Sequence, residues 1–346
     1  MRLEHGPARL FIQTQFCVKP KPIPLTSETD LTGKTAVVTG GNSGLGLHHA
    51  RQLLGLNLSR LILAVRSPEK GESAAVKFRA EFPSAVVSVW SLEMTSYPSI
   101  QAFARRVATE TPDLDIAVLN AGVMQSEFAL NPSTGHERDI QVNYLSTFLL
   151  AILLMPTLRR KVETQNDKSR KGPGRLTIIG SGVAYMARLP NSAKRPFLKS
   201  FDDLSVQPWD MMERYSASKA LHLLFLARLF EHLPPADELI FNVVDPGYCE
   251  GSGLHQHMRG AISVAFSVLA TLTARSLEAG AATYTDAVVV QGKESHGCFV
   301  KDLKIAPFCA LVYTPEGEKL MDVLFEETMA EFEFAGAREI LQSMRS

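Results

Sequence analysis

A run of glycines between a predicted strand and a predicted helix constrains the fold of this chain more than any other feature. The apolar run 35–38 is typical of a buried strand, and a helical pattern of apolar residues follows residue 46. The turn between them reads Thr39-Gly40-Gly41-Asn42-Ser43-Gly44-Leu45-Gly46. Strand, glycine-rich turn and helix are typical of a dinucleotide-binding unit, with the phosphates at the helix N-terminus. An ordinary glycine-rich loop is the alternative that the motif alone leaves open.

Further apolar runs extend this pattern along the chain. Strands are predicted over 35–39, 61–65, 85–90, 116–120, 175–179, 239–244 and 298–300. Helices are predicted near 47–56, 68–82, 96–110, 135–160, 211–232, 276–291 and 316–334. Continuous Val, Ile and Leu runs indicate strands that are buried on both faces, as in a parallel sheet. The sequence therefore predicts a single α/β domain, a doubly wound parallel sheet of about seven strands with helices on both faces.

Residues 1–30 lie outside this pattern and form an N-terminal extension to a domain over 31–346. The stretch Lys19-Pro20-Lys21-Pro22-Ile23-Pro24 favours an extended conformation, since proline donates no backbone hydrogen bond. The sequence does not decide whether this extension packs on the domain.

Charge and cysteine content exclude several classes of function. Lys and Arg number 36 and Asp and Glu also number 36, so nothing predicts a nucleic-acid partner. The four cysteines are scattered, which argues against a disulfide framework or a metal site and fits a reducing, cytoplasmic location. The longest apolar stretch, 261–273, is shorter than the roughly 20 residues that span a bilayer, so we expect a core or lid helix and no transmembrane segment. No secretory signal is predicted at the N-terminus.

The residue type at the end of the second predicted strand indicates which of two dinucleotides the chain binds. An acidic residue about 20 positions after the glycines binds the ribose 2′-hydroxyl of NAD, whereas an arginine accommodates the 2′-phosphate of NADP. Here Arg66 lies at that position and Glu69 lies beyond it, at the start of the next helix. The arginine favours NADP(H) over NAD(H), although a surface arginine at a strand end is the alternative.

A tyrosine and a lysine share one face of a predicted helix. Tyr215 and Lys219 are four residues apart, so both side chains point the same way. An ammonium beside a phenol favours the phenolate and lowers its pKa from about 10 toward neutrality, as a general acid/base requires. Taken alone, the pair is also common on surface helices.

Together, these motifs resemble the short-chain dehydrogenase/reductase family, whose fold is the Rossmann type. The family's glycine motif is met by Thr39, Gly40, Gly44 and Gly46. Its other motifs match Asn120-Ala121-Gly122 after the fourth strand, Asn143, Ser181, Tyr215 with Lys219, and Pro246-Gly247 after the sixth strand. The resemblance is strong from Leu31 to about Gly247 and thin afterwards.

The resemblance implies hydride transfer between a nicotinamide cofactor and a carbonyl carbon. It implies that Ser181 orients the carbonyl oxygen, Tyr215 donates the proton, Lys219 lowers the pKa of Tyr215 and holds the ribose, and Asn143 holds a relay water. The implied cofactor-binding residues are Thr39, Gly40, Asn42, Ser43, Gly44, Leu45, Gly46, Arg66, Glu93, Asn120, Tyr215, Lys219, Pro246 and Gly247. No metal is implied.

Three departures from the family's pattern stand out. Glu93 replaces the usual aspartate near the adenine, and Gly251 falls where a hydroxyl residue is expected, with Ser252 next. Ser181 and Tyr215 are separated by an insertion near 186–210, which we expect to cover the substrate cleft because loops of this length are usually functional. The region 248–275 is expected to act as a lid.

The insertion and the turn after the sixth strand resemble retinol-dehydrogenase-like and fungal biosynthetic members of the family. This likeness implies a rather large apolar ketone, aldehyde or alcohol, such as a secondary-metabolite or lipid-like substrate. An NADPH-sensing regulatory protein without catalysis is an alternative, as is non-redox use of the same site. The sequence leaves both a homodimer and a monomer open.

Overall fold

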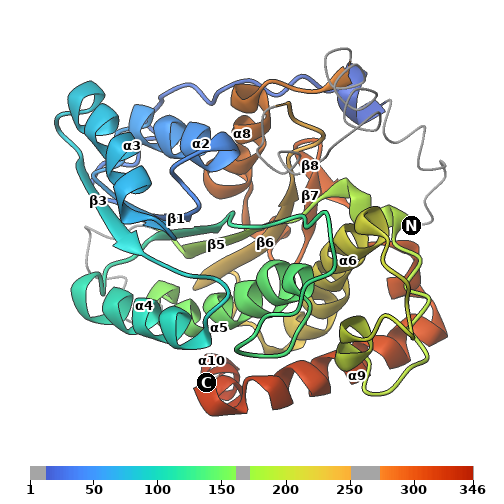
Figure 1. Ribbon diagram of the computed structural model, residues 1–346. Coiled ribbons are helices and arrows are strands. Elements are labelled where there is room, and N and C mark those ends of the chain that lie inside the picture. The colour runs from blue at the N-terminus through green and yellow to red at the C-terminus, as the bar shows by residue number, and fades with distance from the viewer. Residues whose placement is uncertain (1–12, 161–171, 251–272, 346) are drawn as a thin grey trace.

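The computed structural model describes residues 13–160, 172–250 and 273–345 (Figure 1). An eight-stranded sheet in the order β3-β2-β1-β4-β5-β6-β7-β8 forms its centre. The seven strands from β3 to β7 are parallel, and β8 is antiparallel to β7. The strands are β1 (Thr35–Thr39), β2 (Arg60–Val65), β3 (Val86–Ser91), β4 (Ile116–Leu119), β5 (Gly174–Ile179), β6 (Leu239–Asp245), β7 (Phe299–Lys301) and β8 (Lys304–Ala306).

Helices cover both faces of the sheet, which confirms the doubly wound fold (Figure 1). One face carries α2 (Gly44–Gly55), α3 (Pro68–Glu81) and α8 (Leu277–Thr285). The other face carries α4 (Tyr97–Glu110), α5 (Thr147–Leu158) and α6 (Met211–Leu229). Each face has its own apolar core, because the strand residues are buried on both sides, as their continuous Val and Ile runs predict.

Three elements differ from the sequence prediction. The short edge strand β8 was not expected, since Lys304 and Ile305 are exposed and give no apolar run. The helix predicted from residue 135 begins later, because 131–137 form a turn and Ile140–Ser146 form a wide π-helical turn before α5. A final helix, α10 (Ala337–Arg345), follows α9 (Pro315–Glu331) and lies beyond the predicted end of helical structure.

The insertion before α6 is folded against the C-terminal part of the chain. It contains two 3₁₀ turns, Gly182–Met186 and Leu198–Asp202. The carboxylate of Glu327, on α9, accepts hydrogen bonds from the backbone N–H groups of Phe197 and Leu198 at 2.8 and 2.7 Å. Most of the predicted lid, 251–272, lies outside the described residues, and so does all but the last residue of the apolar stretch 261–273.

One continuous helical segment among the described residues, Ile140–Leu158, is long and apolar enough to cross a membrane. However, 83% of its most apolar window is buried inside the protein. It packs between the sheet and the C-terminal helices, so its apolar character is that of a core helix.

Candidate active site

The glycine turn lies at the carboxyl ends of β1 and β2, and its backbone conformation requires glycine. Gly40 and Gly44 have φ angles of +65° and +53°, which side chains other than glycine rarely adopt. A Cβ atom at Gly46 would lie 2.5 Å from Nδ2 of Asn120 and 2.6 Å from the carbonyl oxygen of Gly40. The turn and the helix can therefore approach each other only without side chains.

Asn120 locks this turn to the end of β4. Its Nδ2 donates to the carbonyl oxygen of Thr39 at 2.9 Å, and Oγ1 of Thr39 accepts from the N–H of Ala121 at 2.9 Å. These bonds join the carboxyl ends of β1 and β4, which are neighbours in the sheet. The arrangement gives Thr39 and Asn120 a structural part in shaping the turn.

The residues around the N-terminus of α2 fit an anionic ligand. The exposed Ser43 precedes the helix and its side chain makes no capping hydrogen bond, so the first helical N–H groups and the helix dipole remain available to an anion. The N–H of Gly40 donates to the carbonyl oxygen of Ala64 at 2.8 Å, which places the turn beside the end of β2. Arg66 follows that strand, is exposed, and makes no hydrogen bond or ion pair with the residues that the structure describes. Its guanidinium is free to hold a phosphate group.

Glu93 has a local role in the structure. Its carboxylate accepts from the N–H of Thr95 at 2.9 Å and from Oγ1 of the same residue at 2.8 Å. The N–H of Glu93 donates to Oγ of Ser99 at 2.9 Å. These bonds fix the turn between β3 and α4, so the side chain is already engaged at the edge where the adenine contact is predicted.

Tyr215, Lys219 and Asn143 converge beside the turn after β4. Nζ of Lys219 lies 5.9 Å from the centre of the Tyr215 ring and donates to the carbonyl oxygen of Ile179 at 2.8 Å. A Cβ atom at Gly122 would lie 3.2 Å from Oδ1 of Asn143 and 3.9 Å from Nζ of Lys219. Three distant segments, α6, the π-helical turn before α5 and the turn after β4, thus meet at one point, as the motif spacing predicts.

The side chain of Asn143 is held at both ends. Its Oδ1 accepts from the N–H of Val123 at 2.8 Å, and its Nδ2 donates to the carbonyl oxygen of Val123 at 2.9 Å and to Oγ of Ser218 at 3.0 Å. The amide therefore joins the turn after β4 to α6, and its own position is fixed.

The pKa of Tyr215 shifts in the direction opposite to the sequence prediction. Burial, with smaller contributions from the carboxylates of Asp139 and Asp245, raises the pKa of Tyr215 above its usual value. Burial also lowers the pKa of Lys219 to about 7, and Asp139 opposes that shift. The lowered pKa that the sequence predicts for the tyrosine is therefore not found in this arrangement, because desolvation of the buried phenol raises it. Tyr215 remains a protonated phenol that can donate a proton.

Two polar residues beside this site are not indicated by any sequence motif. Asp139 is fully buried and accepts from the N–H of Gln125 at 3.1 Å, and burial followed by repulsion from Glu137 raises the pKa of its carboxyl to about 8. His222 lies on α6, and its Nε2 is 2.6 Å from the carbonyl oxygen of Asn143. The spacing of Asp139 and Asn143, four residues apart, could have indicated a shared face. Nothing in the sequence indicates the contact of His222.

Ser181 begins the 3₁₀ turn after β5. Its Oγ accepts from the N–H of Val183 at 3.3 Å, and this turn packs against α6. A Cβ atom at Gly182 would lie 2.9 Å from Oδ2 of Asp245, which ends β6. The turns after β5 and β6 are therefore adjacent at the carboxyl edge of the sheet.

The predicted Pro246-Gly247 turn follows β6 at the same edge. Gly247 has a φ of +74°, and its N–H donates to Oδ1 of Asp245 at 3.0 Å. Gly251 and Ser252, which were expected near the nicotinamide, lie outside the described residues.

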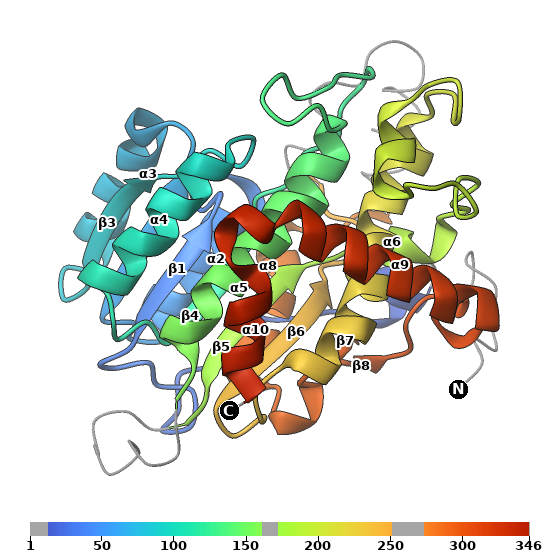
Figure 2. The same ribbon diagram turned by 90° about the horizontal axis from the view of Figure 1, so that it is seen from below.

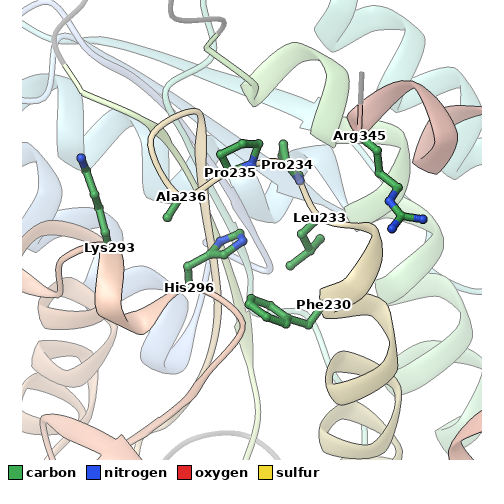
Figure 3. Close-up of a pocket in the computed structure, with 8 residues that line it drawn as sticks. All are labelled: Phe230, Leu233, Pro234, Pro235, Ala236, Lys293, His296 and Arg345. Atoms are coloured by element: carbon green, nitrogen blue, oxygen red, sulfur yellow. The ribbon is translucent and has the colours of Figure 1, made fainter.

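A cavity of about 500 Å³ lies at a different place (Figure 3). Residues that precede β6 and β7 form most of its wall, so it lies at the amino ends of these strands, away from the carboxyl edge. Its lining residues are Phe230, Leu233, Pro234, Pro235, Ala236, Lys293, His296 and Arg345. None of the predicted site residues is among them.

No metal centre is formed by the residues that the structure describes. No group of three or more His, Cys, Asp or Glu side chains there is arranged to hold an ion. The four cysteines, Cys17, Cys249, Cys298 and Cys309, are free thiols.

Comparison with known proteins identifies the family. A model of the family described as short chain dehydrogenase matches residues 34–189. The short chain dehydrogenase/reductase mfmJ of Annulohypoxylon moriforme is 47% identical over 336 residues, covering 97% of this chain and 94% of that protein. This chain belongs to the short-chain dehydrogenase/reductase family. The short chain dehydrogenase virL of Hypocrea virens is 39% identical, with the same coverage of both chains. The protein is thus an oxidoreductase of a family that uses a nicotinamide cofactor.

Solved structures agree with the Rossmann-type fold. An NADP active-site complex of RhlG from Pseudomonas aeruginosa has a TM-score of 0.58 and 22% identity, covering 80% of this chain and 97% of that one. L-Sorbose reductase of Gluconobacter frateurii, complexed with NADPH and L-sorbose, has a TM-score of 0.58 and 20% identity, with the same coverage. At this identity the likeness supports the fold alone.

Proposed function

We propose that this oxidoreductase is NADP(H)-dependent and interconverts a ketone or aldehyde with an alcohol. The observation that carries the proposal is the convergence of Tyr215, Lys219 and Asn143 beside the glycine turn, at the carboxyl edge of the sheet. The exposed Arg66 and the uncapped N-terminus of α2 support a cofactor with a 2′-phosphate. The solved structures with the same fold include complexes with NADP and NADPH.

When bound, the nicotinamide supplies or accepts hydride at its C4 atom. Ser181 donates a hydrogen bond to the substrate carbonyl oxygen and orients it. Tyr215, a protonated phenol in its buried position, gives its proton to that oxygen during reduction. Lys219 holds the cofactor ribose, and Asn143 fixes the segment behind the lysine through its bonds to Val123 and Ser218.

We propose an apolar substrate, of the secondary-metabolite or lipid-like class. Loops after β4 and β5 border the carboxyl edge, and they expose the apolar side chains of Leu130, Met186 and Leu204. Phe128 and Trp209 join the two loops through an edge-to-face contact, with ring centres 6.0 Å apart. Exposed apolar and aromatic side chains beside the site favour a substrate that is itself apolar.

The first experiment compares extracts of the source cells after incubation with NADPH and either the wild-type protein or Tyr215→Phe. Mass spectrometry should find a metabolite that gains two hydrogens only with the wild type, and Tyr215→Phe should lose at least ~100-fold in turnover, as loss of a general acid does. NADPH binding should remain nearly intact in that variant. Tyr313→Phe, which removes the hydroxyl of an exposed tyrosine, is the matched control and should keep wild-type turnover.

Other outcomes of this experiment distinguish between the alternative functions of the site. Unchanged turnover in Tyr215→Phe defeats the assignment of the tyrosine. NADPH binding without any conversion, in either direction, favours an NADPH-sensing role. Product formation without net consumption of nicotinamide indicates dehydration or isomerisation.

A further inference from the structure

The N-terminal extension returns to the carboxyl edge of the sheet and packs beside the turn after β6. Residues Gln13–Cys17 form one π-helical turn, drawn in dark blue above β7 and β8 (Figure 1). Thr14 and Gln15 are only 4% and 7% exposed, although both side chains are polar. Their buried polar atoms must therefore have partners in the domain.

One side-chain amide holds both backbone groups of a residue in the turn after β6. Oε1 of Gln15 accepts from the N–H of Tyr248 at 3.0 Å. Its Nε2 donates to the carbonyl oxygen of Tyr248 at 2.9 Å and to that of Thr273 at 2.8 Å. Gln15 thus supplies both the donor and the acceptor that a neighbouring strand would provide, directly after Pro246-Gly247.

Thr14 belongs to a network of hydrogen bonds and ion pairs that reaches the same turn. Its hydroxyl donates to Oδ2 of Asp302 at 2.7 Å and accepts a hydrogen bond from Lys301. Nζ of Lys301 lies 3.2 Å from Oδ2 of Asp245, whose other oxygen holds the N–H of Gly247. The contacts therefore run from the extension, through β7, to the turn after β6.

Arg275 joins the extension to the turn from the other side. Its guanidinium donates to the carbonyl oxygen of Thr14 at 2.6 Å, to that of Pro246 at 2.9 Å and to Oδ1 of Asp302 at 2.9 Å. A Cβ atom at Gly247 would lie 2.8 Å from Nη1 of Arg275 and 2.9 Å from Oε1 of Gln15. The glycine is enclosed by these two side chains, so the turn has little freedom to move while they are in place.

From these contacts we infer that Thr14 and Gln15 are positioning residues for cofactor binding. They hold the Pro246–Tyr248 turn in the conformation that faces the nicotinamide end of the cofactor. The inference rests on the proposed function, since it assumes that this turn borders the nicotinamide. If the N-terminal extension merely added stability, loss of its contacts would change the unfolding temperature and leave the cofactor affinity of the folded protein unchanged.

The test replaces Gln15 with methionine, which has a similar length and makes none of the three hydrogen bonds. The NADPH dissociation constant is measured by fluorescence titration well below the unfolding temperature, together with kcat and KM. We expect Gln15→Met to bind NADPH about tenfold more weakly, because the freed groups of Tyr248 let the turn rearrange. Phe16→Ala, on an exposed side chain of the same helical turn, is the matched control and should retain wild-type affinity.

Wild-type affinity in folded Gln15→Met overturns the inference, whatever its unfolding temperature. A wild-type protein that binds no NADPH overturns the proposed function instead, so the two failures are distinct. Should Gln15→Met not fold, hydrogen exchange on the wild-type protein decides. NADPH should then slow exchange in peptides covering 13–18 and 246–249 together. Protection of 246–249 alone would contradict the inference.

Discussion

Arg66 is the residue on which the choice of dinucleotide depends. It follows β2 and is exposed. A hydrogen bond from Gly40 to Ala64 holds the glycine turn beside the end of this strand. No carboxylate occupies the position that would bind a free ribose 2′-hydroxyl, since Glu69 lies in the first turn of α3, where its Oε2 accepts from Oγ of Ser67 at 2.8 Å. A bidentate guanidinium contact to phosphate is both strong and specific.

We expect Arg66→Asp to weaken NADPH binding roughly 100-fold, equivalent to about 3 kcal/mol, because a favourable charge pair becomes a repulsive one. NADH binding should change by no more than a few-fold. Titration of both cofactors measures the ratio, and Arg105→Asp, on the exposed surface of α4, serves as the control. Equal losses for NADPH and NADH would sink the 2′-phosphate argument.

At the residue scale, the sequence motifs predicted which side chains lie close together better than they predicted the direction of a pKa shift. Tyr215, Lys219 and Asn143 meet as the motifs predict, because each is placed by the start or end of a regular element. The direction of the pKa shift of Tyr215 was not predicted, because the spacing of residues along a helix does not show how deeply other elements bury the side chain. Gln15 was also missed, because its partners Tyr248 and Thr273 are more than 230 residues away.

At the scale of elements, a buried histidine ties the insertion to α9. Nδ1 of His136 lies 3.0 Å from Asp202, which ends the second turn of the insertion, and Nε2 lies 3.4 Å from Glu331 at the end of α9. Burial opposes the charge of the imidazole, but hydrogen bonds to these two carboxylates outweigh it and raise the pKa of His136 to about 9. The same contacts lower the pKa of Glu331, although burial opposes this shift.

This arrangement predicts a pH dependence of stability. Because the folded-state pKa of His136 is raised above its unfolded value of about 6.5, the ionic contribution is complete below pH ~6.5 and is lost as pH rises through about 9. We expect the unfolding free energies of wild type and His136→Phe to differ by more at pH 6 than at pH 10, by on the order of 3 kcal/mol. Urea unfolding at both pH values measures this difference. Glu331→Gln should reduce the same pH dependence, and a pH-independent difference would contradict the ion-pair account.

The central elements could be predicted from the sequence, whereas several peripheral ones could not. The strands β1, β2, β4, β5 and β6 appear within one or two residues of the predicted bounds, since their apolar runs are buried on both faces. The strand β8 is short and largely exposed, and it forms by pairing with β7. The wide turn at Ile140–Ser146 depends on a tertiary contact, in which Oγ of Ser146 donates to the carbonyl oxygen of Met94. Such contacts leave no local periodicity to detect.

At the scale of the whole molecule, the C-terminal arm, α9 and α10, covers the face formed by α5 and α6 (Figure 2). The hydroxyl of Tyr144 lies 2.6 Å from Oγ1 of Thr328, and the rings of Phe225 and Phe325 stack with centres 5.7 Å apart. Nine of the residues of α5 are buried, so little apolar surface of this helix is left for another copy of the chain. Both helices, α5 and α6, are thus covered by the chain itself.

We therefore expect the wild-type protein to be a monomer. Leu341 and Met344 on α10 are buried, and a charge at the first of these sites should loosen the arm and expose apolar surface of α5. Leu341→Asp is predicted to self-associate and to lose about 3 kcal/mol of stability, in the range for burying an unpaired charge, whereas Gln342→Asp at the exposed neighbouring position should resemble the wild type. Size-exclusion chromatography with light scattering measures the mass of all three proteins. A wild-type mass of two chains, unaffected by Leu341→Asp, would place a dimer interface on another face and leave the arm as a purely structural cover.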